Sequence, residues 1–357
     1  MITRRKVVQG IGATGAASLA APSLGRTQDL RKIKMGFGIK SLNPIIINIL
    51  IGEALGYYRE EGLSFSAIPL GTNSNAMIAL DKGDTEFAVG TPSFQFPLYA
   101  KNQLPPIVNY YEYTYPYKWD VAVKPDSAIK SYADLKGKKI GVSDLGTSDY
   151  PVTRAVLKNL GVDPDKDVQW IAVGAGVAAG VALQRGVIDA LAYFDTGFGQ
   201  IDAAGIEMRM LDRPKDVPLI GGLFISARGD YLKANRRTAI GFARAVNKSS
   251  EFLLANPEAG ARVFVKAFPE TAPRGASEAD AVKSILFAAK RRIPLYRPPY
   301  ENTKMGFIHE SELLLDAKFL GLDSIKDVKP LYTNDMIDEI NNFDREKVIA
   351  QAKAYKS

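Results

Sequence analysis

The sequence predicts an α/β protein of two lobes, with the second lobe inserted into the first. Short β-like runs alternate with helical stretches from residue 33 onward, a pattern typical of mostly parallel sheets. The same order returns in the middle of the chain, where residues 182–189 echo residues 79–86. Two extended apolar runs, 119–123 and 219–227, bracket this second set and are expected to act as paired hinge strands.

The first lobe is expected to open with three strand–loop–helix units. Its predicted strands are 33–39, 64–69 and 86–89, and a loop rich in Gly, Ser, Thr or Asn follows each one. Pro44 favours a helix start after the first loop, because a residue in the first turn needs no intrahelical N–H partner.

The inserted lobe is expected to repeat this plan, with strands 139–143 and 168–173. The glycine-rich run 174–180 follows a strand and opens a helix, as a dinucleotide fingerprint does, with Asp195 in the place of its acid. The same helix carries the internal echo, so a loop of the repeat is favoured over a nucleotide site.

The lobe boundaries follow from these runs, and three late helices complete the first lobe. The predicted helices are 236–255, 276–291 and 334–354. We expect a signal peptide at 1–20, the first lobe at 21–119 and 225–357, and the inserted lobe at 120–224.

The N-terminus is typical of an export signal. Arg4 and Arg5 precede a Gly- and Ala-rich, mildly apolar stretch, and Ser18-Leu19-Ala20 offers small residues for cleavage. Paired arginines before a weak apolar run indicate twin-arginine export, although Val7 stands where such signals usually carry Phe. We therefore expect a periplasmic protein of a Gram-negative bacterium.

Composition excludes several classes of function. The net charge of +7 falls to +4 without residues 1–20, which hold three basic residues and no acid, too little for a nucleic-acid footprint. The chain has no cysteine and one histidine, His309, which excludes a lipid-anchored cysteine, thiolate chemistry and a multi-histidine metal site. We expect a monomer with no cofactor.

Four motifs carry a family resemblance. They are residues 54–63 (Ala-x-Gly-Tyr-Tyr-Arg-Glu-Glu-Gly-Leu), 79–84 (Ala-Leu-x-x-Gly-Asp), 134–142 (Asp-Leu-Lys-Gly-Lys-Lys-Ile-Gly-Val) and 182–190 (Ala-Leu-x-x-Gly-x-x-Asp-Ala). Over residues 32–260 the chain resembles the solute-binding proteins for nitrate, sulfonates and taurine, and those for thiamine pyrimidine precursors. The resemblance implies a type II periplasmic-binding-protein fold, a small-molecule ligand between the lobes, and an ABC-importer permease as partner.

Candidate ligand-binding residues lie where predicted strands end, because ligands of open α/β sheets bind beyond the carboxyl ends of the strands. Most of these loops open helices, whose first N–H groups lack partners and favour anions. The alternative for Ser, Thr, Asn and Asp is helix capping. The candidates are Lys40, Asn43, Thr72, Asn73, Thr91 and Ser93 in the first lobe and Thr147, Ser148, Asp149, Tyr193 and Asp195 in the second.

The segment 110–119 is rich in tyrosine and precedes the first hinge run. Its alternate residues share one face if the strand continues past Pro116, so Tyr113 and Tyr115 are candidates to wall the cleft and stack on a flat ligand. The alternative is a half-buried strand with no ligand contact.

The favoured function is a receptor for a small organic anion with a flat or aromatic portion. Asp149 and Asp195 would repel an anion, which keeps a neutral or amino-bearing heterocycle open as the alternative. A sensor role is equally compatible with the sequence. An enzyme on this fold, similar to pyrimidine synthases or desulfinases, is disfavoured because such relatives use cysteine and histidine.

Overall fold

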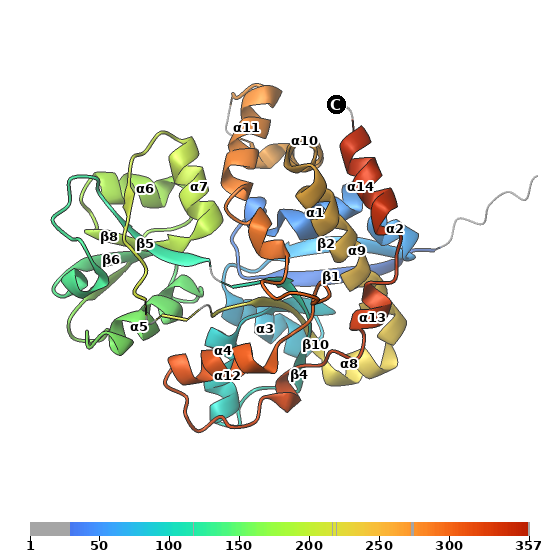
Figure 1. The fold of residues 1–357 in the computed structure, drawn as a ribbon, viewed down its shortest axis with the longest axis horizontal. Coiled ribbons are helices and arrows are strands. Elements are labelled where there is room, and N and C mark those ends of the chain that lie inside the picture. The colour runs from blue at the N-terminus through green and yellow to red at the C-terminus, as the bar shows by residue number, and fades with distance from the viewer. Residues whose placement is uncertain (1–28, 117, 216, 219, 273–274, 356–357) are drawn as a thin grey trace, which may run out of the picture.

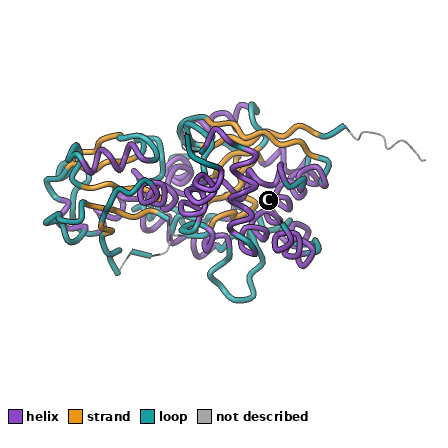
Figure 2. The backbone as a smooth tube through the Cα atoms, turned by 90° about the horizontal axis from the view of Figure 1, so that it is seen from above, coloured by secondary structure: helices purple, strands orange, loops and turns teal. Residues whose placement is uncertain are grey.

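The computed structural model describes residues 29–355, apart from 117, 216, 219 and 273–274. It shows a larger lobe and a smaller lobe that lie side by side, with the C-terminus on the larger one (Figures 1 and 2). The expected signal peptide at 1–20 lies outside the described residues. No helix within the described part of the chain is long and apolar enough to cross a membrane.

The larger lobe is built on a mixed five-stranded sheet. Strand β1 runs parallel to β2 and β3, whereas β10 is antiparallel to both β3 and β4. In spatial order the strands are β2 (Leu63–Pro69), β1 (Arg31–Phe37), β3 (Phe87–Gly90), β10 (Leu223–Arg228) and β4 (Ile107–Thr114).

The smaller lobe repeats the same arrangement, which confirms the predicted two-lobed fold class with an inserted second lobe. Its strand β6 is parallel to β7 and β8, and β5 is antiparallel to β8 and β9. In spatial order the strands are β7 (Gln169–Ala172), β6 (Lys139–Val142), β8 (Ala190–Phe194), β5 (Trp119–Val123) and β9 (Arg209–Met210).

The two runs that bracket the inserted lobe are both strands, but they do not pair with each other. β5 enters the sheet of the smaller lobe, and β10 enters the sheet of the larger one. Each sheet therefore takes its fourth strand from a segment at the crossing between lobes. The crossing points lie just before β5 and just before β10.

Helices cover both sheets (Figure 1). The first lobe carries α1 (Ile47–Ala54), α2 (Tyr57–Glu60), α3 (Asn73–Lys82), α4 (Pro92–Ala100) and η1 (Pro44–Ile46), and the second carries α5 (Asp149–Asn159), α6 (Val177–Gln184), α7 (Asp195–Ala203) and η2 (Tyr132–Leu135). The C-terminal part of the first lobe adds α8 (Gly229–Ala234), α9 (Arg236–Ala255), α10 (Pro257–Ala267), α11 (Glu278–Ala289), α12 (Glu310–Phe319), α13 (Ile337–Ile340), α14 (Arg345–Ala354), η3 (Pro269–Thr271), η4 (Ile293–Tyr296) and η5 (Lys329–Leu331).

The late helices differ in part from the prediction. α9 has the predicted bounds, and α11 is two residues shorter at each end. The single helix predicted over 334–354 is wrong, because residues 341–344 separate α13 from α14. Asp344 begins α14 as its N-cap, since its side chain accepts a hydrogen bond from the Lys347 N–H.

The first family motif has a packing role in the larger lobe. The Tyr58 ring stacks on Phe242 at a centroid distance of 5.2 Å, and its hydroxyl donates to the Ile49 carbonyl at 2.9 Å. Phe65 and Phe87 pack on the same Phe242 ring. Tyr58 of this motif therefore packs β2 and α9 together.

Candidate functional site

A cavity of about 100 Å³ lies between the two lobes, where the strands of both sheets end. Seven candidate residues from the sequence line it: Lys40, Asn43, Asn73, Tyr113, Thr147, Ser148 and Asp149. They come together because the carboxyl ends of the parallel strands in both lobes face the same space.

Much of the cavity wall is apolar. The larger lobe contributes Phe37, Ile45 and Val89, while Trp119 and Phe194 face them from the start of β5 and the end of β8. Tyr113, at the end of β4, adds a ring that is 2% exposed. Such a wall suits the hydrocarbon or aromatic part of a small ligand.

On one side of the cavity the two lobes touch through loops. The Asn73 side-chain amide donates to the Ser148 hydroxyl at 2.9 Å, and the Asn73 N–H donates to the Gly146 carbonyl at 3.2 Å. Lys40 pairs with Asp144 at 3.4 Å between Nζ and Oδ2. These residues therefore close the lobes on each other, as expected of a binding protein around its ligand.

On another side Arg292 joins the lobes. It is fully buried, and its guanidinium donates to both carboxylate oxygens of Asp195 and to the Ile45 carbonyl. Asp195 begins α7 in the smaller lobe, whereas Arg292 follows α11 in the larger lobe. Three of the five guanidinium N–H groups are thus engaged, and Arg292 also lines the cavity.

Asp149 lies against the cavity but is satisfied by its own lobe. One carboxylate oxygen accepts from the Ser143 N–H at 2.7 Å and from the Ser143 hydroxyl at 2.6 Å, and the other accepts from the Thr147 hydroxyl. Burial raises the pKa of Asp149, which the Ser143 and Thr147 bonds oppose. The Asp149 carboxylate therefore orders the loop after β6. In the larger lobe the Asn43 side chain has a similar local role, because it caps η1 by accepting a hydrogen bond from the Ile45 N–H.

Lys118 is a cation deep in the cavity, at the crossing between the lobes. It is 1% exposed, its ammonium donates to the Gly221 carbonyl at 2.5 Å, and it lies 4.8 Å from the Trp119 ring centroid. Burial, together with the nearby positive charge of Arg292, lowers the pKa of Lys118 to about 7.

Six candidate residues lie outside the cavity lining: Thr72, Thr91, Ser93, Tyr115, Tyr193 and Asp195. Thr72 caps α3 by accepting from the Asn75 N–H. Tyr115 is turned away, because its hydroxyl accepts from the Gly306 N–H and donates to the Phe307 carbonyl.

Tyr193 and Asp195 also have internal roles. The Tyr193 hydroxyl accepts from the Gly176 N–H at 2.7 Å and donates to the Gly174 carbonyl, so it shapes the glycine-rich loop from beneath. Asp195 is held by Arg292 through both carboxylate oxygens. Thr91, the N-cap of α4, and Ser93, in its first turn, have buried hydroxyls without a partner among the described residues.

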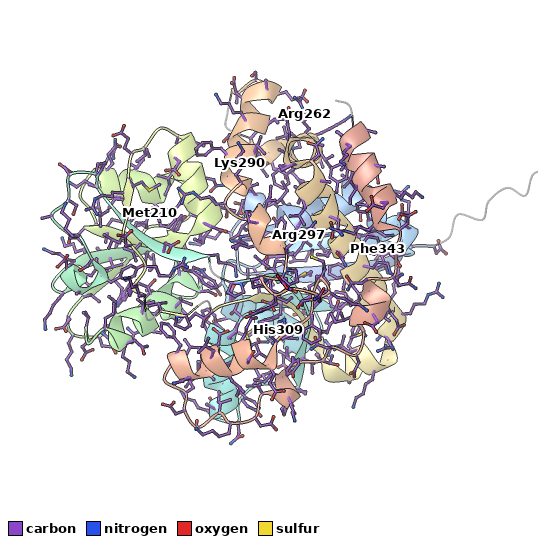
Figure 3. All side chains as sticks on the ribbon, in the orientation of Figure 1. Met210, Arg262, Lys290, Arg297, His309 and Phe343 are labelled. Carbon is purple, nitrogen blue, oxygen red and sulfur yellow. The ribbon has the colours of Figure 1, made fainter. Side chains whose placement is uncertain are left out.

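Sequence reasoning missed both buried cations. It considered helix N-termini sufficient to hold an anion without an arginine, whereas Arg292 reaches the cavity from a segment outside the strand-end loops. Lys118 could have been recognised from the sequence, because it is a lysine placed between the tyrosine-rich run and the hinge strand 119–123. His309 lies in the larger lobe (Figure 3) and is not one of the residues that line the cavity.

Comparison with known proteins finds similar sequences and structures, of which three are described. YtlA of Bacillus subtilis (strain 168), described as a binding protein, is 20% identical over 205 residues, which cover 57% of this chain and 61% of YtlA. A solved structure from Bordetella bronchiseptica RB50 is 24% identical with a TM-score of 0.68, covering 88% of this chain and 98% of the other. The periplasmic aliphatic sulphonate binding protein SsuA from Escherichia coli is 19% identical with a TM-score of 0.59, covering 82% and 92%.

These likenesses bear on fold and family. The chain spans about three-fifths of the length of the curated relative, 61%, and the structural likenesses show the shared periplasmic-binding-protein fold. The model of the NMT1/THI5-like family matches residues 43–260, more than half of the chain. The resemblance expected from the four motifs is therefore confirmed, and the chain belongs to the NMT1/THI5-like family.

Proposed function

We propose that this protein is the solute-binding receptor of an ABC importer and closes its two lobes around one small molecule. The observation that carries this proposal is the cavity at the crossing of two lobes whose loops meet over it. Membership of the NMT1/THI5-like family and the fold shared with SsuA support the receptor role.

We propose a small organic anion with a flat apolar part as the ligand. Three cations, Lys40, Lys118 and Arg292, line the cavity. Its acids are neutralised or hydrogen-bonded: Asp144 pairs with Lys40, and Asp149 accepts from Ser143 and Thr147. Lys40 and Arg292 are themselves paired, with Asp144 and Asp195, so among the described residues Lys118 is the lining cation left to meet a ligand anion. The bonds from Ser143 and Thr147 to Asp149 reduce the repulsion between that carboxylate and an anion.

A receptor accounts for the cavity better than an enzyme does. Nucleophilic catalysis needs a nucleophile next to a base that can take its proton. Of the residues that line the cavity, Ser143 and Thr147 donate their hydroxyls to Asp149 at the start of α5, where these bonds order the loop. The proposal therefore includes no turnover of the ligand.

The test is a thermal-shift screen followed by mass spectrometry of the incubated ligand. The screen contains benzoates, phthalates, aryl and alkyl sulfonates, taurine, nitrate and aminopyrimidines. A true ligand at a hundredfold excess over its Kd should raise the free energy of unfolding by about 2.7 kcal/mol. Conversion of that ligand into a product would overturn the receptor role, and stabilisation by nitrate or taurine alone would exclude the aromatic part.

The location belongs to the same proposal. A receptor that feeds an inner-membrane permease works outside the cytoplasm, and the paired Arg4 and Arg5 of the expected signal are consistent with twin-arginine export to the periplasm.

A further inference from the structure

We propose that Lys118 is the specificity-determining residue for ligand charge, and that it takes up a proton as an anion binds. This inference deepens the proposed receptor function and rests on it. The consequence is a receptor whose affinity for anions falls as the pH rises, while its affinity for neutral molecules does not.

The geometry places Lys118 where a ligand anion must meet it. Its side chain lines the cavity, is 1% exposed, and donates one N–H to the Gly221 carbonyl. An ammonium has three N–H donors, so two remain for a ligand. Its own carbonyl accepts from the Asp195 N–H at 2.9 Å, which holds the backbone of Lys118 against the smaller lobe.

The charged groups around Lys118 come from four segments, and none forms an ion pair with it in the described part of the chain. Arg292, after α11, repels the Lys118 ammonium. Its partner Asp195 on α7 attracts the ammonium, although both Asp195 oxygens are bound to the guanidinium. Glu112 on β4 and Asp316 on α12 attract it, and Glu312 on α12 interacts with it as well.

The three carboxyl groups are poor counterions for Lys118. Burial raises the pKa of Glu112 and Asp316 well above their usual range, and it raises that of Glu312. Burial likewise brings the pKa of Lys118 to about 7. In the empty protein the amine is therefore protonated below this pH and neutral above it, because Asp195, Glu112 and Asp316 offset the effect of burial only in part.

An anion in the cavity restores the missing counter-charge and raises the pKa of Lys118 again. By linkage the Kd of an anion is flat below pH 7 and rises by up to about tenfold per pH unit above it. Between about pH 6 and about pH 8.5 the Kd should therefore rise by about 30-fold. A neutral ligand of the same shape has no such dependence.

The experiment compares probes of one shape and different charge. Benzoate and benzenesulfonate are the anions, benzamide is neutral and benzylamine is a cation, and all keep their charge between about pH 6 and pH 8.5. Binding is measured by calorimetry at both pH values. At about pH 7 in two buffers of different ionisation enthalpy, the unmodified protein should take up about half a proton per bound anion.

Lys118→Met tests the residue directly, and Lys40→Met is the matched control. Lys40 is the exposed lysine of the same cavity, 63% accessible and paired with Asp144. Lys118→Met should weaken anion binding at the lower pH and abolish both the pH dependence and the proton uptake. Lys40→Met lowers the affinity to some degree but keeps the pH profile.

Each outcome decides between the two proposals. Equal anion affinity at both pH values, no anion binding at the lower pH, or an unchanged pH profile in a folded Lys118→Met variant overturns the role of Lys118. If a neutral molecule from the screen binds and no anion does, the receptor function stands and the Lys118 proposal fails. If no compound of either set binds, the proposed function itself fails.

Discussion

At the scale of a single residue, Glu112 is a carboxyl group buried in an unfavourable environment. Its carboxylate is 1% exposed at the end of β4, and neither oxygen has a hydrogen-bond partner among the described residues. Burial raises its pKa well above the usual range, and the neighbouring Glu312 and Asp316 raise it further. Gly222 accommodates the carboxyl group, since a Cβ at that position would collide with it.

Glu112→Gln is expected to stabilise the protein at pH 8. A carboxyl whose pKa is raised on folding contributes stability that is present below its unfolded pKa and lost as the pH rises through the folded pKa. The neutral amide avoids the buried charge, so the free energy of unfolding should increase by about 1–2 kcal/mol at pH 8 and change little near pH 4. Urea unfolding at both pH values measures the difference.

Glu258→Gln is the control for this prediction. Glu258 is an exposed residue of α10 that pairs with Arg262, and such a pair contributes less than about 1 kcal/mol. A loss of stability at pH 8 in Glu112→Gln would mean that the charged form of Glu112 is favourable, most simply through its attraction to Lys118.

At the scale of elements, the contact between α7 and α11 joins the lobes on the side away from the loops (Figure 1). Gly199 of α7 lies against the backbone of Ala288, where a Cβ would stand 2.7 Å from the Ala288 Cα. Arg291 pairs with Asp202 at 2.7 Å beside this contact, and Arg292 holds Asp195 at the start of α7. The glycine therefore allows two helices from different lobes to meet at backbone distance.

Gly199→Ala is expected to destabilise the closed form. An alanine normally stabilises a helix by about 1 kcal/mol over glycine. Here the methyl group would collide with the backbone of Ala288, which cannot move away as a flexible side chain could. Overpacking of this kind costs about 1–3 kcal/mol, seen as a lower Tm and weaker ligand binding.

Gly229→Ala serves as the matched control for Gly199→Ala. Gly229 begins α8, and a Cβ there would have ordinary contacts at 3.5 Å or more. A gain in Tm from Gly199→Ala, of the size helix propensity predicts, would show that α7 and α11 are not held this close in solution.

For the whole molecule, the proposed function requires reversible closure of the lobes, and the absence of cysteine from the sequence allows a direct test of this closure. A Cβ on Gly146 would lie 2.9 Å from the Thr72 Cβ across the lobes. A disulfide needs about 3.5–4.5 Å between these two Cβ atoms, so the two loops have to move apart by less than about 1.5 Å to accommodate one.

Thr72→Cys combined with Gly146→Cys is expected to form a disulfide that locks the lobes. In the oxidised protein the radius of gyration, measured by solution scattering, should no longer respond to ligand, and release of a trapped ligand should slow. Reduction releases the lock, and Thr72→Cys alone behaves as the parent. Gly146→Cys alone cannot form the disulfide, and its Cβ would lie 2.9 Å from the Thr72 Cβ, so this variant reports the effect of that contact without the lock. Failure of the pair to oxidise, in a folded protein, would contradict the closed arrangement of these loops.

Much of the fold could be read from local sequence. The periods of apolar residues and the Gly, Pro and Asn positions placed β1, β2, β3, β6 and β7 to within two residues, because strands and their following loops depend on near neighbours in the chain. The gap between α13 and α14 was not recognised, although Asn341 to Asp344 are typical of a helix break and a new N-cap.

The sequence by itself determined the two-lobed plan and the loops that line the cavity, including Lys40, Asn73 and Ser148, since the strand–loop–helix unit is local. Only the tertiary structure decided that Tyr113 faces the cavity whereas the Tyr115 hydroxyl bonds to the 306–307 backbone. It also brought Arg292 to Asp195, from a segment far away in the chain. Such pairings depend on how distant elements pack, and no local pattern of residues encodes the packing of one lobe against the other.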